Sequence, residues 1–300
     1  MTPEDSDAPP PTRSLLGKAQ LFAYRRMLGM LARRRWRDGS GGDPAKVRPG
    51  TRIPFICNLC GTPNAGTLAQ LSREALTCTH CGSNVRFRAM GYLVTREILG
   101  QPAALPDFPE NKAIAGIGLS DAEAYAKPLA RKFSYANTFY HTDPRLDITD
   151  VDESHTGRYD FIIASDVFEH VTTPVSRAFV NARRMLKPGG KLIFTVPFVP
   201  EGHTKEHFPD LFEWTIEERD GTWTLQNRTL GGEVQTFTDL VFHGGPGSTL
   251  EMRLFSQGDL TREFLHAGFS RVRIASEPYL PFGIHWPEPW SVPMVAYAGE

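Results

Sequence analysis

The sequence predicts an α/β protein: a mostly parallel sheet with helices on both faces, preceded by a small four-cysteine module and a basic helix. Strand and helix signals alternate from residue 113 to the C-terminal end, which is typical of parallel strands joined by crossover helices. All four cysteines lie upstream of this alternation, in two closely spaced pairs. The expected strands span residues 113–117, 133–140, 160–165, 191–198, 270–276 and 292–298, with helices near 121–132, 174–186 and 259–267.

The composition is that of a globular protein with a substantial core. The 300-residue chain is 40% apolar and 22% charged, which excludes disordered and collagen-like classes. No stretch of the sequence approaches the roughly 20 apolar residues that a membrane span needs. The first residues, MTPEDSDAPPPT, are acidic and proline-rich, whereas a secretory signal is basic and then apolar. We therefore expect a cytoplasmic protein.

The N-terminal part of the chain is strongly basic, because residues 1–95 carry 14 Lys and Arg against 6 Asp and Glu. Residues 1–12 offer little to bury and are expected to be disordered. Residues 13–37 combine apolar side chains at three- and four-residue steps with arginines, which predicts an amphipathic basic helix. Such a helix packs on its own chain, or docks on a membrane surface or a partner protein. Residues 38–50 are rich in Gly, Pro and Asp and predict a linker.

The cysteine pattern is CxxC-x17-CxxC, formed by Cys57, Cys60, Cys78 and Cys81, with a glycine directly after each pair. Four thiolates from two such knuckles suit the tetrahedral coordination of zinc, and backbone amides near the glycines can hydrogen-bond the sulfurs. Two disulfides are not expected in a cytoplasmic chain, and a redox CxxC would not occur twice. The pattern therefore predicts a zinc ribbon with a structural metal ion.

Glycine and proline positions divide the rest of the chain. A helical pattern over residues 90–100 follows the ribbon, and residues 101–110 form a loop with three prolines. The expected parts are a tail, basic helix and linker over 1–50, the ribbon with its following helix over 51–100, and an α/β domain over 106–300 with an insertion at about 199–256.

One segment, RYDFIIASDVFEHVTTPVSRAFVNARRMLKPGGKLIFTVPF (residues 158–198), combines several specific features. An acid precedes an apolar strand. This strand is followed by a turn with Glu and His, an amphipathic helix, an LKPGG turn and a second apolar strand. This combination strongly resembles class I S-adenosylmethionine-dependent methyltransferases of the small-molecule type. The resemblance covers about residues 112–200 and implies a Rossmann-like sheet with S-adenosylmethionine as the cofactor.

The segment AIAGIGLSD occupies the place of that family's glycine-rich loop. The resemblance implies that Gly116 and Gly118 let the backbone approach the methionine part of the cofactor. Ser120 with Glu123 is expected to form a capping box, so that the next helix begins with free amides aimed at the ligand. The sequence departs from the family because Ile114 replaces the usual acid and a third glycine is absent.

The family normally binds both ribose hydroxyls with an acid after its second strand, and this sequence offers His141 or Asp143 there. Asp147, followed by Ile148, fits the family's next landmark, which is an acid that accepts from the adenine amino group beside an apolar side chain. Each aspartate has an ordinary loop-capping role as its alternative.

The turn SDVFEH follows a strand whose carboxyl end faces the expected cofactor crevice. The resemblance places Ser165 and Asp166 against the cofactor, and Glu169 and His170 at the site of methyl transfer. The latter two would align the acceptor, remove its proton, or only support the turn. The pattern acid-xx-Glu-His also resembles the divalent-metal site of certain small-RNA and quinone-precursor O-methyltransferases, which would make Asp166, Glu169 and His170 metal ligands.

The insertion lies where this family usually caps its acceptor pocket. It carries three histidines that are candidate bases, His203, His207 and His243. His243 is preferred, because HGGPG predicts a rigid turn that holds the imidazole in place. An ordinary structural role is the alternative for each of them.

The sequence thus predicts methyl transfer to a hydroxyl of a small molecule or glycan, with N-methylation left open. RNA methylation is a second hypothesis, because some ribosomal-RNA methyltransferases also begin with a zinc module and because Arg86 and Arg88 follow the cysteines. A degenerate methyltransferase fold that acts as a binding protein is a third, because the glycine loop is incomplete.

Overall fold

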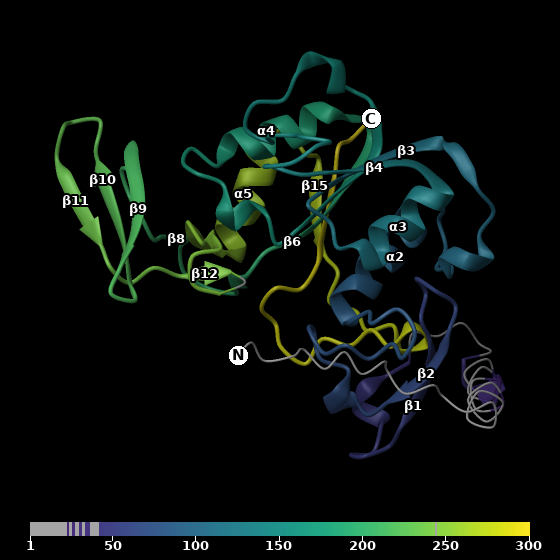
Figure 1. Ribbon diagram of the computed structural model, residues 1–300. Coiled ribbons are helices and arrows are strands. Elements are labelled where there is room, and N and C mark those ends of the chain that lie inside the picture. Colours follow the sequence, from purple (N-terminus) through teal and green to yellow (C-terminus); the bar gives the residue numbers. More distant parts are fainter. Residues whose placement is uncertain (1–22, 24–25, 28–29, 32–33, 37–41, 244) are drawn as a thin grey trace, which may run out of the picture.

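The computed structural model describes residues 42–243 and 245–300, together with positions 23, 26–27, 30–31 and 34–36. Its largest element is a six-stranded sheet with the order β15-β16-β6-β5-β3-β4 (Figure 1). The sequence predicted a strand at each of these six places. The strands are β3 (Asn111–Leu119), β4 (Phe133–Thr138), β5 (Tyr159–Ser165), β6 (Leu186–Thr195), β15 (Arg271–Ile274) and β16 (Met294–Tyr297).

Four neighbouring strands of this sheet are parallel. β3 pairs in parallel with β4 and β5, and β5 pairs in parallel with β6, whereas β16 is antiparallel to both β6 and β15. The chain runs from β3 to β4 on one side and returns to β5 on the other side, so the topological switch lies between β3 and β5. The predicted mostly parallel sheet is confirmed.

Alternate side chains of β5 serve two separate cores. Phe161 and Ile163 belong to one buried cluster, and Ile162 and Ala164 to the other. The helices that cover the two faces are α2 (Val85–Ile98) and α3 (Glu123–Lys132) on the first, and α4 (Ser176–Met185) and α5 (Gln257–His266) on the second (Figure 1). A strand covered on both faces buries every side chain, which explains the continuous apolar run. Helices on both faces are therefore confirmed.

Helix α2 begins five residues earlier than the sequence predicted. It starts at Val85, because the side chain of Asn84 caps it by accepting a hydrogen bond from the Phe87 amide at 2.8 Å. The helix packs against α3, β5 and β6, and its apolar side chains join the core of the cysteine module to that of the sheet. The division of the chain between residues 100 and 106 stays a prediction.

The cysteine module contains an antiparallel hairpin, β1 (Ile53–Ile56) and β2 (Pro63–Gly66), and the buried side chains of β1 join the same core cluster as those of α2. Arg88 of α2 is completely buried behind it. Its Nε donates to the Phe282 carbonyl at 2.8 Å and its Nη2 to the Gly283 carbonyl at 2.9 Å. These bonds fasten the module to the C-terminal part of the chain.

Most of the predicted basic helix over 13–37 lies outside the described residues, as do the expected disordered tail and part of the linker. The seven described positions between Ala23 and Arg35 are helical. Trp36 Nε1 then donates to the Pro54 carbonyl at 3.1 Å, which ties the end of this segment to the cysteine module. Within the described part of the chain, no helix has the length and apolar character to cross a membrane.

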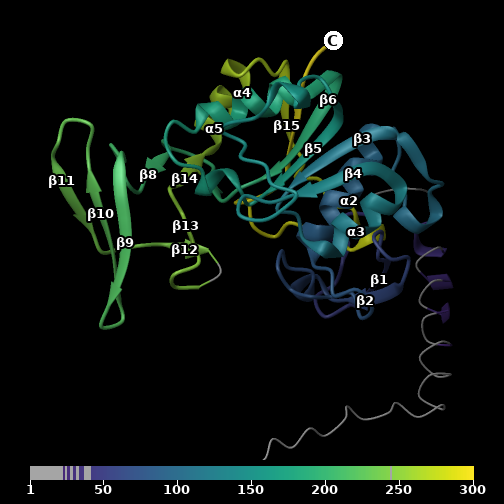
Figure 2. The same cartoon turned by 45° about the horizontal axis from the view of Figure 1, so that its top comes forward.

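The region between β6 and α5 is built mainly from short strands. Three of them, β9 (Glu213–Arg219), β10 (Thr222–Arg228) and β11 (Val234–Phe237), form an antiparallel sheet that stands apart from the six-stranded sheet (Figures 1 and 2). The others are β7 (Phe198–Val199), β8 (Lys205–Glu206), β12 (Phe242–His243), β13 (Thr249–Leu250) and β14 (Arg253–Ser256). Because β14 pairs with both β7 and β8, the insertion returns to the point where it left the sheet.

Short 3-10 helices complete the described chain: η1 (Pro44–Lys46), η2 (Leu68–Gln70), η3 (Leu105–Asp107), η4 (Glu153–His155), η5 (Phe168–His170) and η6 (Leu280–Phe282). The most important of these for the site is η5, which directly follows β5. Arg253 of β14 is fully buried and donates to the Phe168 carbonyl at 3.1 Å and to the Val171 carbonyl at 2.5 Å. The insertion therefore holds the turn after β5 in place.

Candidate functional site

The four cysteines converge on one point. Sγ of Cys57 lies 3.7 Å from Sγ of Cys81, and Sγ of Cys60 lies 3.6 Å from Sγ of Cys78. All four are free thiols, and their sulfurs lie within 4.8 Å of one another. A tetrahedral zinc ion with Zn–S bonds of about 2.3 Å holds its sulfurs about 3.8 Å apart. The predicted four-cysteine cluster is confirmed, and its geometry fits zinc.

Polar groups around the sulfurs also suit a bound zinc ion. The Ser83 hydroxyl lies 3.3 Å from Cys57 Sγ, and Asn64 Nδ2 donates to Cys78 Sγ at 3.5 Å. Burial lowers the pKa of Arg88 to about 10, and the charge of nearby Cys57 and the other thiolates opposes this decrease. Arg88 therefore stays cationic at neutral pH and offsets part of the negative charge of a zinc–thiolate cluster.

The carboxyl ends of β3 and β5 form the edge where an open α/β sheet binds its ligands. The first residue after each strand has a left-handed backbone: φ is 56° at Ser120 and 57° at Asp166. This conformation is costly for a residue with a side chain and concentrates at functional sites. Two such residues side by side, at the topological switch, mark this edge as the candidate site.

Asp166 is the most strongly bound side chain of the edge. Arg73 Nη2 donates to both of its carboxylate oxygens at 2.7 and 2.8 Å, Thr195 Oγ1 donates at 2.9 Å, and Arg86 Nη1 lies 3.4 Å away. Burial opposes ionisation of this carboxyl, but the charges of Arg73 and Arg86 outweigh burial and lower its pKa. Asp166 is therefore a carboxylate that is already neutralised by two arginines.

Arg73 comes from the loop between the two cysteine pairs and Arg86 from the first turn of α2, so this part of the chain completes the edge of the sheet. Arg86 also donates to the Ser165 hydroxyl at 3.0 Å and pairs with Glu74. Sequence reasoning did not identify Arg73, which carries no local motif and lies 93 residues from its partner Asp166. The predicted cofactor contacts Ser165 and Asp166 lie at this edge, beside Arg86.

Asp121 lies behind the edge, between β3 and α3. Its carboxylate accepts hydrogen bonds from the hydroxyls of Tyr125, at 2.8 Å, and Tyr135. Burial raises the pKa of Asp121 to about 7, although these hydrogen bonds and the charge of Arg86 oppose the increase. The predicted capping box at Ser120 is wrong: α3 begins after Ala122 with no side-chain cap, because the left-handed backbone at Ser120 precedes it by two residues.

The pKa of Asp121 gives a prediction about stability. In the unfolded chain this carboxyl ionises near 3.8, whereas in the folded protein it ionises near 7. Its contribution to stability is therefore complete below the lower value and is lost as the pH rises through the higher one. We expect the variant Asp121→Asn, which keeps a polar side chain without the charge, to lose this part of the pH dependence. Denaturant unfolding at a series of pH values tests it, and equal pH slopes for the two proteins would contradict it.

Gly116 and Gly118 lie inside β3, not in a loop after it. A Cβ at Gly116 would stand 2.2 Å from the Phe161 ring, and one at Gly118 would stand 2.0 Å from the Tyr135 hydroxyl. Gly116 lines a hollow of about 460 Å³ near the opposite, amino-terminal ends of the strands, together with Lys112 and Arg158. Close packing therefore accounts for both glycines, and a valine at Gly118 would disturb the fold as well as a ligand.

The predicted ribose and adenine residues lie in the loop after β4. His141 and Asp143 are exposed, and Ile148 is buried in the core cluster below the loop. Asp147 Oδ1 accepts hydrogen bonds from the amide and the hydroxyl of Thr149, at 2.8 and 2.7 Å. Asp147 thus caps its own turn, which is the structural alternative that the sequence left open. Its contact with adenine stays a prediction.

A second polar group lies next to Asp166. Glu169, His170 and His243 bring one carboxylate oxygen and two ring nitrogens within 4.8 Å of one another. Burial, with the charge of Asp166, raises the pKa of Glu169 well above its ordinary value, and burial lowers the pKa of His170. The sequence singled out all three residues but did not predict that His243, 73 positions after His170, would join the turn.

Other predicted residues do not join this group. Asp166 is not part of this group among the described residues, because Arg73 and Arg86 bind its carboxylate. The metal set of Asp166, Glu169 and His170 stays a prediction. His203 is exposed, and His207 Nε2 lies 3.1 Å from a carboxylate oxygen of Glu251.

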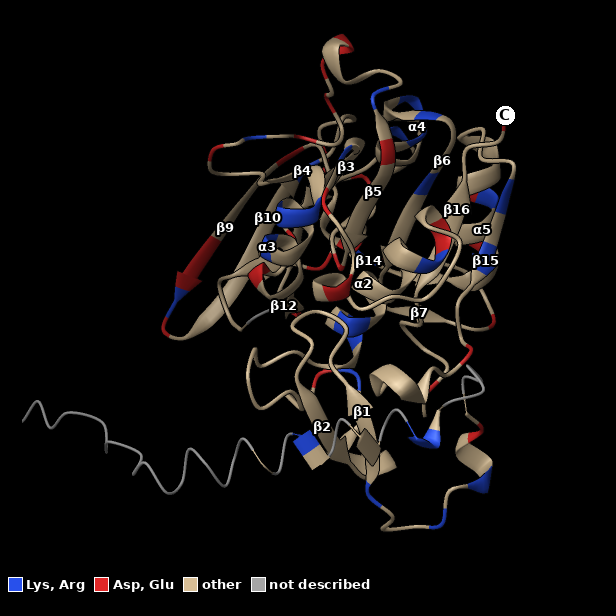
Figure 3. Cartoon of the chain, turned by 90° about the vertical axis from the view of Figure 1, so that its right-hand side faces the viewer, with Lys and Arg blue, Asp and Glu red and all other residues tan. Residues whose placement is uncertain are grey.

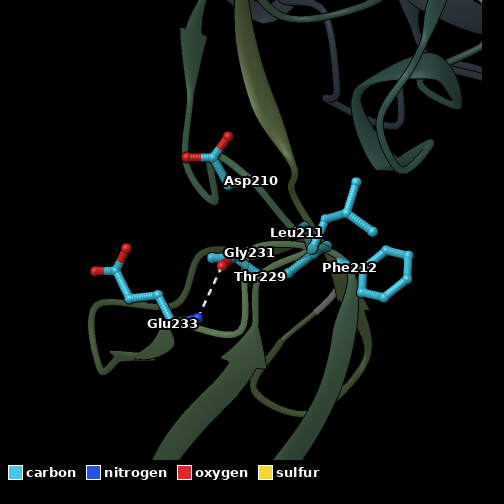
Figure 4. A pocket seen from close by; sticks show the side chains of 7 residues that line it. Asp210, Leu211, Phe212, Thr229, Gly231 and Glu233 are labelled. Atoms are coloured by element: carbon cyan, nitrogen blue, oxygen red, sulfur yellow. Dashed lines mark hydrogen bonds between the residues drawn. The ribbon is translucent and has the colours of Figure 1, made fainter.

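The insertion contains a separate hollow of about 330 Å³ at the base of its antiparallel sheet (Figure 4). In this hollow the Glu233 amide donates to the Thr229 hydroxyl at 3.1 Å. It is lined by Asp210, Leu211, Phe212, Thr229, Leu230, Gly231 and Glu233. It contains none of the predicted site residues.

The cysteine module does not present the two arginines on which the RNA hypothesis was based. Arg88 is fully buried, and Arg86 is bound to Glu74 and close to Asp166. Along the ribbon in Figure 3, Lys and Arg positions alternate with Asp and Glu positions. The described residues therefore give no structural support for an RNA-binding surface around these arginines.

The sheet is mostly parallel, is covered by helices on both faces and has a polar edge at the switch point. These features define a Rossmann-like domain. The family described as a methyltransferase domain matches residues 107–273, which is more than half of the chain. The chain belongs to this family and is an S-adenosylmethionine-dependent methyltransferase.

Individual relatives are distant. The fold is similar to that of a 1,6-didemethyltoxoflavin-N1-methyltransferase from Burkholderia thailandensis, at 11% identity and a TM-score of 0.40, over 70% of this chain and 76% of that one. It is also similar to CalS10, an amino pentose methyltransferase from Micromonospora echinaspora, at 14% identity and a TM-score of 0.39, over 69% and 88% of the two chains. A stretch of 57 residues is 49% identical to the hybrid PKS-NRPS synthetase xenE from Xenoacremonium sinensis, and it spans 19% of this chain but 1% of that protein. These likenesses do not identify an acceptor.

Proposed function

We propose that this methyltransferase acts on a hydroxyl group of a small molecule or glycan. The observation that carries the proposal is the group of Glu169, His170 and His243 next to the switch point. An amine can attack a methyl group directly, whereas a hydroxyl must lose its proton, and imidazole and carboxylate groups serve this purpose. The acceptor oxygen forms a bond to the methyl carbon, the carbon–sulfur bond breaks with its electron pair going to sulfur, and the hydroxyl proton leaves toward this group.

We place the cofactor across the carboxyl ends of β3 and β5, with its adenine beside Asp147 and Ile148 and its ribose near His141 or Asp143. Ser120, with its left-handed backbone, and Ser165 then flank the methionine end. Arg86 is the cation best placed for the cofactor carboxylate, because its guanidinium reaches Ser165 at the crevice. Gly116, near the far ends of the strands, has no part in this placement.

Replacing Arg86 by methionine should weaken cofactor binding. A hydrogen bond to a charged group contributes about 1.5 to 3 kcal/mol, so the Kd for S-adenosylmethionine should rise by roughly ten- to a hundredfold. Calorimetric titration measures this, and Arg131→Met, at an exposed arginine of α3, is the matched control. If Arg86→Met bound the cofactor as tightly as the unaltered protein, the placement would be wrong.

The acceptor itself is identified by incubating a cell extract with the enzyme and cofactor carrying an isotopically labelled methyl group. Mass spectrometry should reveal label on an oxygen of a small molecule or saccharide. Label on a nitrogen, or on RNA, would contradict the hydroxyl proposal. Tight cofactor binding with no labelled product from any extract would instead favour a binding protein built on this fold.

A further inference from the structure

Glu169 is buried in an unusual way. Its side chain has no exposed surface, and neither of its carboxylate oxygens has a hydrogen-bond partner among the described residues. A buried carboxylate without a partner is strongly unfavourable, so such groups are normally paired, hydrogen-bonded or bound to a metal ion. The charges of Asp166 and Glu251 disfavour ionisation of Glu169 and raise its pKa, whereas the charge of Arg73 opposes them.

His170 is oriented as a metal-binding histidine would be. Its Nδ1 donates a hydrogen bond to the Leu250 carbonyl at 2.9 Å, which fixes the ring and leaves Nε2 as the free lone-pair nitrogen. Nε2 lies 3.8 Å from Oε1 of Glu169. Both residues belong to η5, which Arg253 holds from below.

The third side chain comes from the insertion. His243 lies on β12, and the centroid of its ring is 5.3 Å from that of His170. The neighbouring backbone is fixed to the same turn, because the Met252 amide donates to the Glu169 carbonyl at 2.8 Å. His243 is exposed, so one side of the group is open to solvent.

The spacing suits a transition-metal ion after a small adjustment. The three ligand atoms lie within 4.8 Å of one another, and ligands at about 2.1 Å from an ion lie roughly 3 to 4 Å apart. The exposed His243 side chain can supply this movement. Asp166 is unsuited to the same ion, because Arg73 and Arg86 already neutralise its carboxylate.

We propose that Glu169, His170 and His243 form a second metal site, separate from the four cysteines, which takes a divalent first-row transition cation. Two imidazoles and one carboxylate on one side of the ion leave further coordination positions for water or an acceptor oxygen. In turnover the ion binds the acceptor oxygen and favours its deprotonation, and this role rests on the proposed hydroxyl methylation. The binding of the ion itself does not rest on that proposal.

The test is a titration of the purified full-length protein, with zinc in the cysteine cluster, by Co²⁺ alone. We expect one Co²⁺ per chain to bind and to give ligand-field absorption in the visible range without the thiolate-to-cobalt charge-transfer bands that a cysteine site would show. Glu169→Gln and His243→Ala should each raise the Kd for Co²⁺ by about a hundredfold or more, whereas His266→Ala, at an exposed histidine at the end of α5, should not.

Thermal unfolding without added metal separates ligand loss from misfolding. Glu169→Gln replaces a buried carboxyl that has no hydrogen-bond partner and keeps the shape of the side chain, so without added metal it should unfold at the same temperature as the unaltered protein or higher. Added Co²⁺ should stabilise only the unaltered protein and His266→Ala. Absence of a cobalt site, thiolate charge-transfer bands alone, or unchanged affinity in Glu169→Gln would each overturn the proposal.

The labelled-methyl assay keeps the two proposals distinguishable. Cobalt binding that depends on Glu169 and His243, together with label on nitrogen only, supports the metal site and contradicts hydroxyl methylation. Label on oxygen, together with cobalt affinity that Glu169→Gln leaves unchanged, does the reverse.

Discussion

Loss of metal from the cysteine cluster is expected to abolish cofactor binding as well as the fold of residues 51–95. Structural zinc contributes about 10 to 16 kcal/mol to small zinc modules, which is as large as the whole stability of a typical domain. Here the module also shares one buried core with α2 and the sheet, and its Arg73, together with Arg86 at the start of α2, neutralises Asp166. Without these residues in place, the Asp166 carboxylate would lose both of its cationic partners.

The measurement is metal content, circular dichroism and cofactor calorimetry on the same samples. Freshly purified protein should contain about one zinc ion per chain in the cysteine cluster. A strong chelator, or the variant Cys78→Ser, should remove that zinc and raise the Kd for S-adenosylmethionine by at least a hundredfold. Zinc added back after chelation should restore both the metal content and the cofactor affinity. Purified protein with no zinc and with its four thiols paired as disulfides would disprove the assignment.

The elements of the sheet could be predicted from the sequence because their signals are local. The apolar run predicted over residues 160–165 became β5, one residue longer, since burial on both faces requires just such a run. The cysteine pairs were equally plain, because the CxxC spacing itself brings two sulfurs together. The start of α2 was missed although it too has a local signal, the cap at Asn84.

The contents of the site could be predicted only in part, because they depend on pairs that are distant in the sequence. No local pattern connects Arg73 with Asp166, or His243 with His170. Arg73 meets Asp166 because α2 docks the cysteine module on the sheet. His243 meets His170 because β14 returns beside η5. The end of β3 was predicted two residues too early, at residue 117, for a similar reason. Pairing of Leu119 with Thr138 and Ala164 extends β3 beyond both of its glycines.

Replacing His170 by asparagine is expected to lower turnover by roughly a hundredfold, which is a typical contribution of a group that takes or directs the acceptor proton. The Kd for S-adenosylmethionine should change by less than about twofold, because the proposed cofactor contacts are Ser120, Ser165, Arg86 and the loop after β4, and His170 is not among them. Asparagine is chosen because its amide nitrogen can take the place of Nδ1 and keep the hydrogen bond to the Leu250 carbonyl. Only Nε2 is removed.

The comparison with His170→Ala then separates chemistry from support of the turn. Alanine removes both nitrogens, so it should match asparagine in turnover but unfold at a lower temperature, since it also breaks the contact between η5 and β13. If His170 only supported the turn, His170→Asn would be as stable and as active as the unaltered protein. If Nε2 acts as a base, activity persists in a chelator mild enough to leave the cysteine cluster loaded, whereas a metal-binding Nε2 makes that activity depend on added divalent cation.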